Sequence, residues 1–572
     1  MLDFSLKIGG QAGQGLQTIG DVISKALLRS GYHVFTVQDY LSRIRGGHNF
    51  TQVRVKDQPV ASIRPVVNLL VALDRATIDE HAGELLPGGA VIHDEAFQVP
   101  ASAAGHLLPL PLKGLAKEAG DPVTENTVAA GAIWGLVSGD LDLLLGLLAE
   151  TFFPKGARLV EVNHKAARLG HDFARERCPQ CLPVRLARLQ APARLLITGN
   201  EALGLGALAA GCRWMSAYPM TPSTGIMNYL AAKSAEYGLV VEQAEDEIAA
   251  INMAVGASFG GLRALTATSG GGFALMNEAL SLSAMTETPI VVVLGQRPGP
   301  ATGLPTRTGQ EELLYALHAG AGEFTRVILA PGTAEEAFHL MTKAFNLADR
   351  YQIPVIILSD QHLADSYFTV EDLDFLGRVK IDRGDLWDPT GQPPYSYRRH
   401  VWTENGVSPR LFPGTPNQLV VTDSDEHTED GHITEDLQTR VKMVDKRLRL
   451  KQRALRGEIA PPRLYGPITA DVTLLGWGST QGAITEAVDA LRRRQVAANA
   501  IIFTEIWPMP VESAKAVLAN RRRLVAVENN AGGQLSRLLH DSTGIESDHQ
   551  ILKYDGRPFT ADYILAGLSG LV

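Results

Sequence analysis

The sequence predicts an α/β protein built from several doubly wound, mainly parallel β-sheets. Its 572 residues are too many for a single hydrophobic core. At roughly 150 residues per domain, this length predicts about three or four domains. Short apolar runs that predict strands alternate with runs of helical period, which is typical of parallel sheets. Glycine-rich turns follow several of these strands, at the edge where α/β folds bind ligands.

The composition excludes several classes of protein. Hydrophobic residues make up 45% of the chain and charged residues 20%, which is ordinary for a globular protein. The formal net charge of −9 gives no sign of nucleic acid as a partner. No apolar run approaches the roughly 18 residues of a membrane span, and a strand pattern starts at Phe4. We therefore expect no membrane partner, no signal peptide and a cytoplasmic location.

The three cysteines limit the redox and metal chemistry of this chain. They cannot form a disulfide scaffold, and a cubane iron–sulfur cluster normally needs four thiolates. Cys178 and Cys181 form a CxxC pair, and Cys212 stands alone. We interpret the pair as part of a polar linker, with a lost or shared metal site as the alternative, and assign no residue as a metal ligand.

Residues 1–185 are predicted to form the first α/β domain. A strand over Phe4–Ile8 leads through a glycine-rich turn into a helix whose apolar residues recur every three and four positions. Val128–Leu148 is interpreted as a buried helix, although Asp140 and Asp142 interrupt it. Further strands are expected over His33–Val37, Phe50–Val55, Asn68–Leu73 and Ala90–His93.

Two further α/β patterns cover residues 194–370 and 467–572. Helices in the first of them are expected over Glu247–Phe259 and Ala334–Ala348. Its strands are expected over Leu195–Thr198, Trp214–Tyr218, Ala264–Thr268, Ile290–Leu294, Val327–Leu329 and Val355–Ser359. The last pattern predicts a helix over Thr480–Arg493 and strands over Val472–Leu475, Asn499–Phe503 and Leu524–Glu528.

An arm over residues 371–466 separates these two patterns. Its first half is rich in Pro, Gly and Tyr and has no clear period, and such long loops usually serve as arms, lids or interfaces. Arg440–Arg456 is strongly basic, and we interpret it as a solvated connecting helix. A surface for an acidic partner is the alternative. One face of this helix carries the apolar residues Val441, Val444, Leu448 and Leu455.

The turn between the first strand and the first helix is a candidate anion site. Gly10, Gly13 and Gly15 let the backbone approach an anion, and the helix N-terminus offers free N–H groups. Their spacing differs from the dinucleotide fingerprint, so a tight turn alone is the alternative. A later loop with paired glycines also suits a phosphorylated or anionic ligand, and it carries Arg43, Arg45 and His48.

Two strand-to-helix junctions of the second domain carry candidate site residues. Prolines fix the turn Tyr218–Thr224 and leave Thr221 free to aim its hydroxyl out of the carboxyl edge of the sheet. Glu247 opens a helix of small apolar residues. A helix-dipole role explains most acids near a helix N-terminus. A carboxylate that enters a buried surface can also share a proton with a ligand.

Arg297 and Arg307 flank a glycine- and proline-rich loop that follows a hydrophobic strand. A guanidinium group binds a carboxylate through two parallel hydrogen bonds, so both residues are candidate clamps for an anionic substrate. Exposed arginines are often only solvated, and that alternative stays open here.

These motifs resemble those of the 2-oxoacid:ferredoxin oxidoreductases, in the same order and over nearly the whole chain. The first domain resembles their gamma subunit, the second their alpha subunit, and the last their transketolase C-terminal-like domain. Gly271 stands where the family usually carries Pro. The motifs are Gly9-Gly-Gln-Ala-Gly-Gln-Gly15, Ile44-Arg-Gly-Gly-His48, Gly199-Asn-Glu-Ala202, Tyr218-Pro-Met-Thr-Pro-Ser223, Glu247, Thr268-Ser-Gly-Gly-Gly272, Thr302-Gly-Leu-Pro-Thr306, Gly476-Trp-Gly-Ser-Thr480, Pro508-Met-Pro510, Val527-Glu-Asn-Asn530 and Tyr554-Asp-Gly-Arg-Pro558.

The resemblance implies CoA-dependent oxidative decarboxylation of a 2-oxoacid on thiamine diphosphate, with electrons passing to ferredoxin through an iron–sulfur cluster. It implies that Glu247 activates the cofactor, and that Thr221 and Arg297 hold the keto and carboxylate end of the substrate. Thiamine enzymes bind diphosphate and Mg2+ through a Gly-Asp-Gly stretch, which this sequence lacks. A partner beta subunit is therefore expected to hold thiamine diphosphate, Mg2+ and the 4Fe–4S cluster, in a dimer of heterodimers.

A fused gamma–alpha chain most resembles the 2-oxoglutarate enzymes, which form succinyl-CoA and CO2 or run in reverse to fix CO2. Arg307 is then the candidate clamp for the distal carboxylate. Pyruvate or a branched-chain 2-oxoacid is the first alternative. A CoA-binding subunit of acyl-CoA ligase type and a non-catalytic scaffold are alternatives of other classes.

Overall fold

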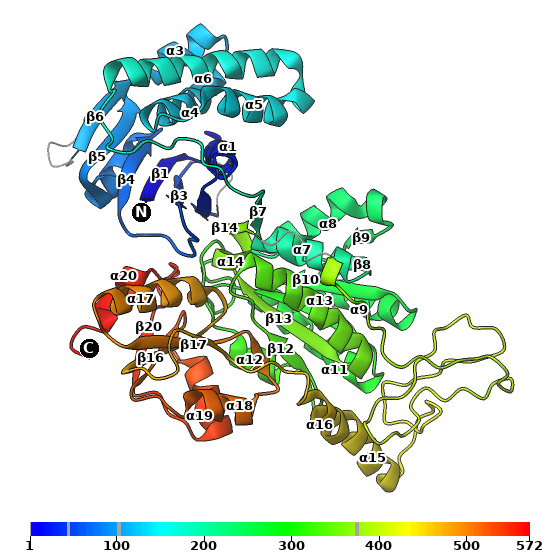
Figure 1. The fold of residues 1–572 in the computed structure, drawn as a ribbon. Coiled ribbons are helices and arrows are strands. Elements are labelled where there is room, and N and C mark those ends of the chain that lie inside the picture. The colour runs from blue at the N-terminus through cyan, green and yellow to red at the C-terminus, as the bar shows by residue number, and fades with distance from the viewer. Residues whose placement is uncertain (1, 43–45, 100–104, 372–376, 572) are drawn as a thin grey trace. The chain divides into compact units, whose positions relative to one another are not determined.

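A computed structural model describes residues 2–42, 46–99, 105–371 and 377–571. The chain divides into two compact units (Figure 1). Unit 1 comprises Met1–Ile197, Ser366–Leu373 and Thr560–Asp562, and unit 2 comprises the remaining residues. The expected α/β class, with strands and helices alternating along the chain, is confirmed.

The described part of unit 1 holds an eight-stranded sheet in the order β6-β5-β4-β1-β3-β2-β14-β7. The sheet is mixed, because β3 runs antiparallel to both β1 and β2, whereas β1, β4, β5 and β6 are parallel. Its strands are β1 (Asp3–Gln11), β2 (His33–Asp39), β3 (His48–Lys56), β4 (Val67–Ala72), β5 (Leu85–Asp94), β6 (Gly105–Leu110), β7 (Leu195–Thr198) and β14 (Tyr367–Val370).

The prediction that Leu195–Thr198 begins the second sheet is wrong. This segment forms β7, an edge strand beyond β14 in the sheet of unit 1. β14 pairs with β2, and Thr369 strengthens the junction because its hydroxyl accepts from the Val34 N–H at 2.8 Å and donates to the Val34 carbonyl at 2.9 Å. Four residues carry too little pattern to reveal which edge they join.

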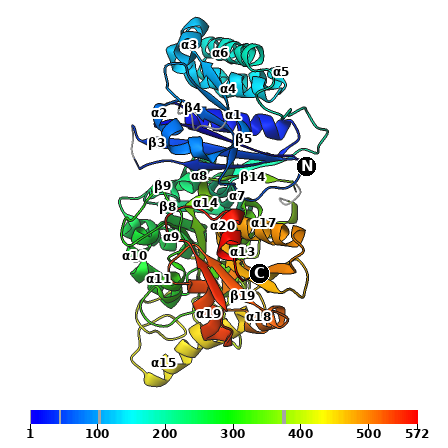
Figure 2. The same cartoon turned by 90° about the vertical axis from the view of Figure 1, so that its left-hand side faces the viewer.

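Helices cover the sheet of unit 1 in layers, with α6 stacked on α4 (Figure 2). Glycines allow this close contact, since a Cβ at Gly131 would lie 2.0 Å from the Ala167 carbonyl oxygen, and one at Gly170 would lie 1.9 Å from that of Val128. The helices are α1 (Leu16–Arg29), α2 (Arg75–His81), α3 (Leu112–Ala119), α4 (Glu125–Leu136), α5 (Leu141–Phe152) and α6 (Ala157–Arg177).

The interpretation of Val128–Leu148 as a buried helix is wrong in its extent. The segment forms parts of two helices, α4 and α5. Asp140 separates them because it caps α5, where its side chain accepts from the Asp142 N–H at 3.1 Å.

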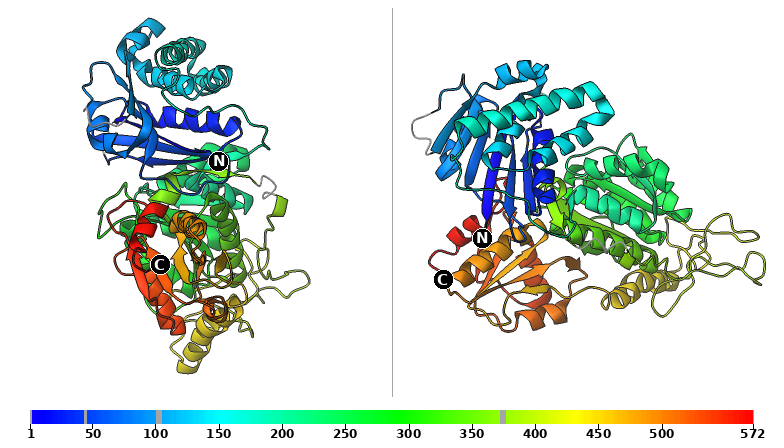
Figure 3. Two further views of the ribbon diagram at one scale, coloured as in Figure 1. Left: turned by 60° about the vertical axis from the view of Figure 1, so that its left-hand side comes forward. Right: turned by 45° about the horizontal axis from the view of Figure 1, so that its top comes forward.

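The larger sheet of unit 2 has the order β18-β12-β13-β11-β10-β8-β9 in the described residues. Figure 3 shows unit 2 from two further sides, in colours from green to red. All neighbouring strands in this sheet are parallel except β18, which runs antiparallel to β12 and has no counterpart among the predicted strands. Its strands are β8 (Cys212–Ala217), β9 (Val240–Gln243), β10 (Arg263–Thr268), β11 (Ile290–Gln296), β12 (Val327–Leu329), β13 (Pro354–Asp360) and β18 (Glu505–Trp507). Its helices are α7 (Gly199–Ala209), α8 (Thr224–Tyr237), α9 (Glu247–Phe259), α10 (Gly270–Leu275), α11 (Asn277–Met285), α12 (Leu313–His318), α13 (Ala334–Tyr351) and α14 (Gln361–Asp365).

The C-terminal part of unit 2 has a five-stranded sheet, ordered β15-β17-β16-β19-β20. Both sheets of unit 2 share one hydrophobic core, in which Leu475, Trp477 and Phe503 join Ile328 and Ile356. The strands are β15 (Arg463–Tyr465), β16 (Val472–Trp477), β17 (Ala498–Phe503), β19 (Leu524–Glu528) and β20 (His549–Leu552), and the helices are α17 (Gln481–Arg493), α18 (Val511–Leu518), α19 (Gln534–Thr543) and α20 (Ala561–Gly567).

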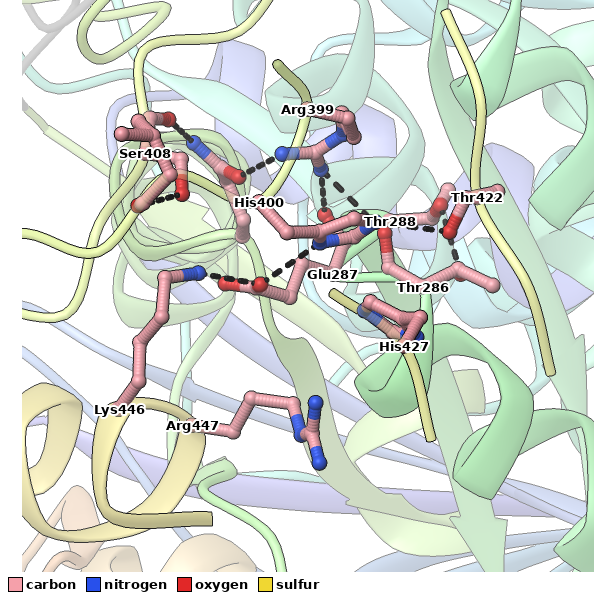
Figure 4. Close-up of polar contacts among 12 residues, drawn as sticks. Thr286, Glu287, Thr288, Arg399, His400, Ser408, Thr422, His427, Lys446 and Arg447 are labelled. Atoms are coloured by element: carbon pink, nitrogen blue, oxygen red, sulfur yellow. Dashed lines mark hydrogen bonds and ion pairs between the residues drawn. The ribbon is translucent and has the colours of Figure 1, made fainter. Parts of the chain in front are cut away.

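The arm is anchored to unit 2 by a network of buried charges around Glu287, which lies between α11 and β11 (Figure 4). The side chains of Glu287, Lys446 and His400 are fully buried. The carboxylate binds the ammonium groups of Lys446 and Lys451, and it lies 2.9 Å from His400 Nδ1. Burial alone would raise the pKa of Glu287, but Lys446 and Lys451 hold it well below its ordinary value.

Both interpretations of the basic segment Arg440–Arg456 are contradicted for its central lysines. The segment forms α15 (Leu437–Val444), a π-helical turn (Asp445–Leu450) and α16 (Lys451–Leu455). The π-turn breaks the 3.6-residue period on which the predicted apolar face depends. As a result Lys446 and Lys451 point inward, whereas the side chain of Val441 is exposed.

Cys178 and Cys181 are joined as a disulfide at the end of α6, and both belong to the hydrophobic core of unit 1. Their burial in this core differs from the polar linker that the sequence predicts. Within the described ranges no helix has both the length and the apolar character that crossing a bilayer requires.

Candidate functional site

Glu247 is the first residue of α9, which begins and ends where the sequence predicts. Asp246 caps this helix, because its side chain accepts from the Ala249 N–H at 2.7 Å. Because Asp246 already caps the helix, Glu247 is not needed for this role. Its side chain turns into the structure, and the residue is only 4% exposed. Glu242 and Glu245, by contrast, are exposed.

The glycine turn after β10 packs directly against Glu247. A Cβ at Gly272 would lie 2.7 Å from Glu247 Oε1 and 2.2 Å from Thr268 Oγ1. Only glycine therefore lets these two polar groups converge at the N-terminus of α10. Gly271 differs, since a Cβ there would meet only the Ala301 carbonyl oxygen, at 3.9 Å. Position 271 therefore has room for a Cβ atom, whereas position 272 does not.

The turn Tyr218–Thr224 is held by hydrogen bonds to its backbone carbonyl groups. Arg297 Nη1 donates to the Thr221 carbonyl at 2.8 Å, and Asn200 Nδ2 donates to the Pro222 carbonyl at 2.9 Å. Met220 lies beside Thr268, whose hydroxyl is 3.9 Å from the methionine sulfur. The structure thus brings Glu247, Thr221 and Arg297 to one edge of the sheet, the edge at which parallel strands end.

Arg297 is held in a largely dry position beside a buried carboxyl group. Its side chain is 7% exposed, and its Nε has no hydrogen-bond partner. Burial lowers the pKa of the guanidinium, and Glu312 opposes this effect. Burial, aided by Glu311, raises the pKa of Glu312 to about 8. An uncharged Glu312 leaves the positive charge of Arg297 available to an anionic ligand.

Arg307 lies at the other end of the loop that starts at Arg297. Its Cβ and Cγ approach Gly556, which lies in the loop after β20. The Thr308 N–H donates to the Gly556 carbonyl at 3.2 Å. Arg307 is therefore positioned by the C-terminal part of unit 2, whereas Arg297 is positioned by the Thr221 turn.

Gln310 joins the two sheets of unit 2 and was not identified from the sequence. It is fully buried, and its side-chain amide donates to the Trp477 carbonyl at 2.8 Å and accepts from the Asn529 N–H at 3.0 Å. On the C-terminal side of this junction, Glu528 accepts from the Leu535 and Ser536 N–H groups, each at 2.9 Å, at the start of α19. The C-terminal motifs of the sequence therefore fix the loop that carries Arg297 and Arg307.

The glycine turn of unit 1 has the expected position between β1 and α1. Gly13 and Gly15 have φ values of 96° and 72°, which favour glycine. A Cβ at Gly13 would meet nothing within 4 Å, whereas one at Gly10 or Gly15 would clash with Gln14 or Asn126. Arg43 and Arg45 lie outside the described residues. His48 lies at the start of β3, where its imidazole faces His81 at an Nε2–Nε2 distance of 2.8 Å.

Comparison with known proteins identifies the family. The family model described as pyruvate flavodoxin/ferredoxin oxidoreductase, thiamine diphosphate-binding, matches residues 205–446. The model described as pyruvate ferredoxin/flavodoxin oxidoreductase matches residues 5–173. The 2-oxoacid:ferredoxin oxidoreductase 2 alpha subunit of Aeropyrum pernix is 33% identical over 98% of this chain and 96% of its own. The chain belongs to the family of 2-oxoacid:ferredoxin oxidoreductase alpha subunits. It is thus a subunit of an oxidoreductase, as the sequence motifs predict.

Two other members of the family carry substrate names. The 2-oxoglutarate oxidoreductase subunit KorA of Mycobacterium tuberculosis is 30% identical over 99% of this chain and 91% of its own. A solved 2-oxoglutarate:ferredoxin oxidoreductase from Magnetococcus marinus, with 2-oxoglutarate, coenzyme A and succinyl-CoA bound, is 32% identical and has a TM-score of 0.92. That match covers 100% of this chain and 99% of the other, so the two chains share their fold over the full length of this oxidoreductase subunit.

Proposed function

We propose that this chain is the gamma–alpha fused subunit of a 2-oxoglutarate:ferredoxin oxidoreductase. The reaction converts 2-oxoglutarate and CoA into succinyl-CoA and CO2, with two electrons passed to ferredoxin; the reverse direction would fix CO2. The observation that carries the proposal is the buried carboxylate of Glu247, aimed at the glycine turn after β10, in a chain that matches a 2-oxoglutarate enzyme from end to end.

Glu247 is proposed as the residue that activates thiamine diphosphate. When bound, thiamine diphosphate would supply the nucleophilic carbon and the electron sink that decarboxylation of a 2-oxoacid needs. The local chemistry fits, because a shielded carboxylate can share a proton with a nitrogen of a flat heterocycle. In this arrangement Glu247 would hold a proton at the ring.

A partner beta subunit is proposed to hold the diphosphate, Mg2+ and the 4Fe–4S cluster, because this sequence has neither Gly-Asp-Gly nor four cysteines. Exposed apolar side chains near Glu247 support docking of such a partner. They comprise Ile248 and Met253 on α9 and Leu275 on α10, which packs against α9. The complete enzyme is then a dimer of heterodimers.

Thr221, Arg297 and Arg307 are proposed to bind the substrate. Arg297 pairs with the carboxylate next to the keto group, and Thr221 holds the keto oxygen. Arg307 is assigned to the distal carboxylate of 2-oxoglutarate. The raised pKa of Glu312 supports the role of Arg297, because a neutral neighbour does not compete for the guanidinium.

CoA is proposed to contact the glycine turn of unit 1 and the loop that follows β2. The candidate residues are Gly10, Gly13, Gly15, Arg43, Arg45 and His48, and the open surroundings of Gly13 support this assignment. The proposed domains are a gamma-type domain (1–185), a pyrimidine-binding domain (194–370), the arm (371–466) and a transketolase C-terminal-like domain (467–572).

The direct test is an assay of the chain produced together with its beta subunit. CoA-dependent reduction of methyl viologen is measured with 2-oxoglutarate, pyruvate and a branched-chain 2-oxoacid. We expect the highest kcat/KM with 2-oxoglutarate, and succinyl-CoA as the product. A preference for pyruvate or the branched-chain acid would identify that acid as the substrate instead. Acyl-CoA formation without viologen reduction would exclude the oxidoreductase proposal.

A further inference from the structure

A cluster of metal-ligand side chains lies in unit 1, apart from every residue used above except His48. His48 is the first residue of β3 and pairs with Gln11 at the end of β1. Glu80 and His81 are the last residues of α2, which follows β4. One ligand atom from each of these three side chains lies within 4.8 Å of the others. The cluster therefore occupies the carboxyl edge of the parallel strands β1 and β4.

Hydrogen bonding fixes the tautomer of His81. Its Nδ1 lies 2.8 Å from Glu84 Oε1, so the ring donates an N–H to this carboxylate. The lone pair of His81 is then on Nε2, which points at His48 Nε2 at 2.8 Å. A histidine whose second nitrogen is bonded to a carboxylate is the usual arrangement of a metal ligand in proteins.

His48 is held in a largely buried position beside His81. Its side chain is 9% exposed. The ring packs beside Gly9, where an added Cβ would lie 3.0 Å from His48 Cε1. Its Nδ1 has no hydrogen-bond partner, although Asp74 Oδ1 lies 3.9 Å away.

We propose that His48, His81 and Glu80 bind a divalent metal ion of the zinc class. A zinc–nitrogen bond of about 2.0–2.1 Å places two tetrahedral ligands about 3.3 Å apart. The two Nε2 atoms would therefore open only slightly from their present 2.8 Å. The exposed side chain of Glu80 is free to close the third position, which leaves a fourth for water or a ligand.

Two imidazoles and one carboxylate favour zinc and its transition-metal neighbours over Mg2+ or Ca2+, which prefer oxygen ligands. The positive charge of Lys7 lies near the cluster and is balanced by the carboxylate of Glu84, which it binds. Its ammonium binds Glu84 and lies 3.3 Å from His81 Nδ1, the nitrogen that faces away from His48. Bound metal would also draw the N–H of His48 to Nδ1, toward Asp74, and so satisfy the buried atom that now lacks a partner. In this proposal the contact between His48 and CoA is indirect and runs through the bound metal ion.

The test uses the full chain, freed of metal by a chelator and then titrated with Zn2+ or Co2+ alone. We expect one equivalent of Zn2+ to bind and Co2+ to give the visible absorption of a tetrahedral site. Glu80→Gln should weaken Zn2+ binding at least tenfold, and His81→Gln should remove the cobalt spectrum. Because Glu80 is exposed, its variant is expected to fold normally, which thermal unfolding without metal would verify.

Controls separate this site from other ligands. His106→Gln, at an exposed histidine of the same sheet, and the double variant Cys178→Ser/Cys181→Ser should bind Zn2+ as the parent does. Absence of a bound equivalent would overturn the proposal. Undiminished binding in folded Glu80→Gln and His81→Gln, or loss of binding only in the cysteine variant, would overturn it equally. The histidines would then form a plain hydrogen-bonded pair.

Discussion

Adjacent glycines in the turn after β10 have different roles at the scale of single residues. Gly272 faces Glu247 and Thr268, whereas Gly271 faces open space. We predict that Gly272→Ala lowers turnover of the assembled enzyme at least tenfold, because the methyl group displaces the Glu247 carboxylate from its position. Gly271→Ala is the matched control and should keep the parent rate. Equal rates in both variants, measured by viologen reduction, would show that the contact with Glu247 does not matter.

Glu312 predicts a specific pH dependence of stability. Its pKa is about 8 in the folded chain, against 4.5 in its ordinary state. Between these pH values the folded state keeps a proton that the unfolded state has released. The stabilisation of the folded state by this proton is fully present below pH 4.5 and is lost as pH rises through about 8. One proton corresponds to a slope of about 1.4 kcal/mol per pH unit.

The unfolding free energy of the parent should therefore fall by up to this slope between about pH 5 and 8. Glu312→Gln cannot titrate and should lack this part of the pH dependence. Denaturant unfolding at several pH values, for the parent and the variant, measures the difference. Glu311→Gln serves as the neighbouring control. Parallel pH profiles of parent and Glu312→Gln would mean that Glu312 is ionised in the folded chain.

Sequence could identify Glu247 but not Glu312. Glu247 is followed by an unbroken helical pattern, so its place at a helix N-terminus is a local property. Glu311 and Glu312 are neighbouring acids in a loop, a pattern typical of solvated residues. Only tertiary contacts bury Glu312, where Gly270 leaves room for its carboxylate. Gln310 escaped prediction for the same reason, because its partners Trp477 and Asn529 are far along the chain.

At the scale of elements, regular strands and helices of unit 2 were predictable and irregular connections were not. α9, β12 and β19 have the expected bounds, because each carries a clear period or a compact apolar run. The short strands β9, β14 and β18 were missed. Their three or four residues gain their conformation from pairing with other strands, which a local pattern does not encode.

The arm gives the prediction at this scale. Glu287 is the buried counter-charge of Lys446 and Lys451, so Glu287→Gln leaves two buried ammonium groups without a carboxylate. Breaking a buried pair costs about 3–5 kcal/mol. We expect this loss in the unfolding free energy, and faster proteolysis within the arm under native conditions.

Glu404→Gln is the matched control, because Glu404 lies on the same arm and is exposed. It should behave like the parent in both measurements. If Glu287→Gln kept the parent's stability and protease resistance, the buried network would not be what fastens the arm.

At the scale of the whole molecule, we propose that the chain carries one half of a catalytic centre. In this proposal it supplies Glu247 and the arginines, because its sequence has no Gly-Asp-Gly stretch and only three cysteines. We predict that the chain purified without its beta subunit is colourless, contains no iron–sulfur cluster and is inactive. Absorption spectroscopy, iron analysis and the viologen assay test this together. A brown and active preparation of the single chain would contradict the assignment of thiamine diphosphate and the iron–sulfur cluster to the beta subunit.

Activation of thiamine diphosphate by Glu247 is the central claim, and exchange of the cofactor's C2 proton tests it most directly. The measurement uses NMR after quenched incubation in D2O, with the assembled enzyme carrying Glu247→Gln. Glutamine keeps the shape of the side chain but cannot share the proton. We predict normal assembly, slow C2 exchange and turnover lower by on the order of a hundredfold or more. The control Glu245→Gln, at an exposed acid of the same segment, should exchange and turn over normally. Normal C2 exchange in well-assembled Glu247→Gln would show that another group activates the cofactor.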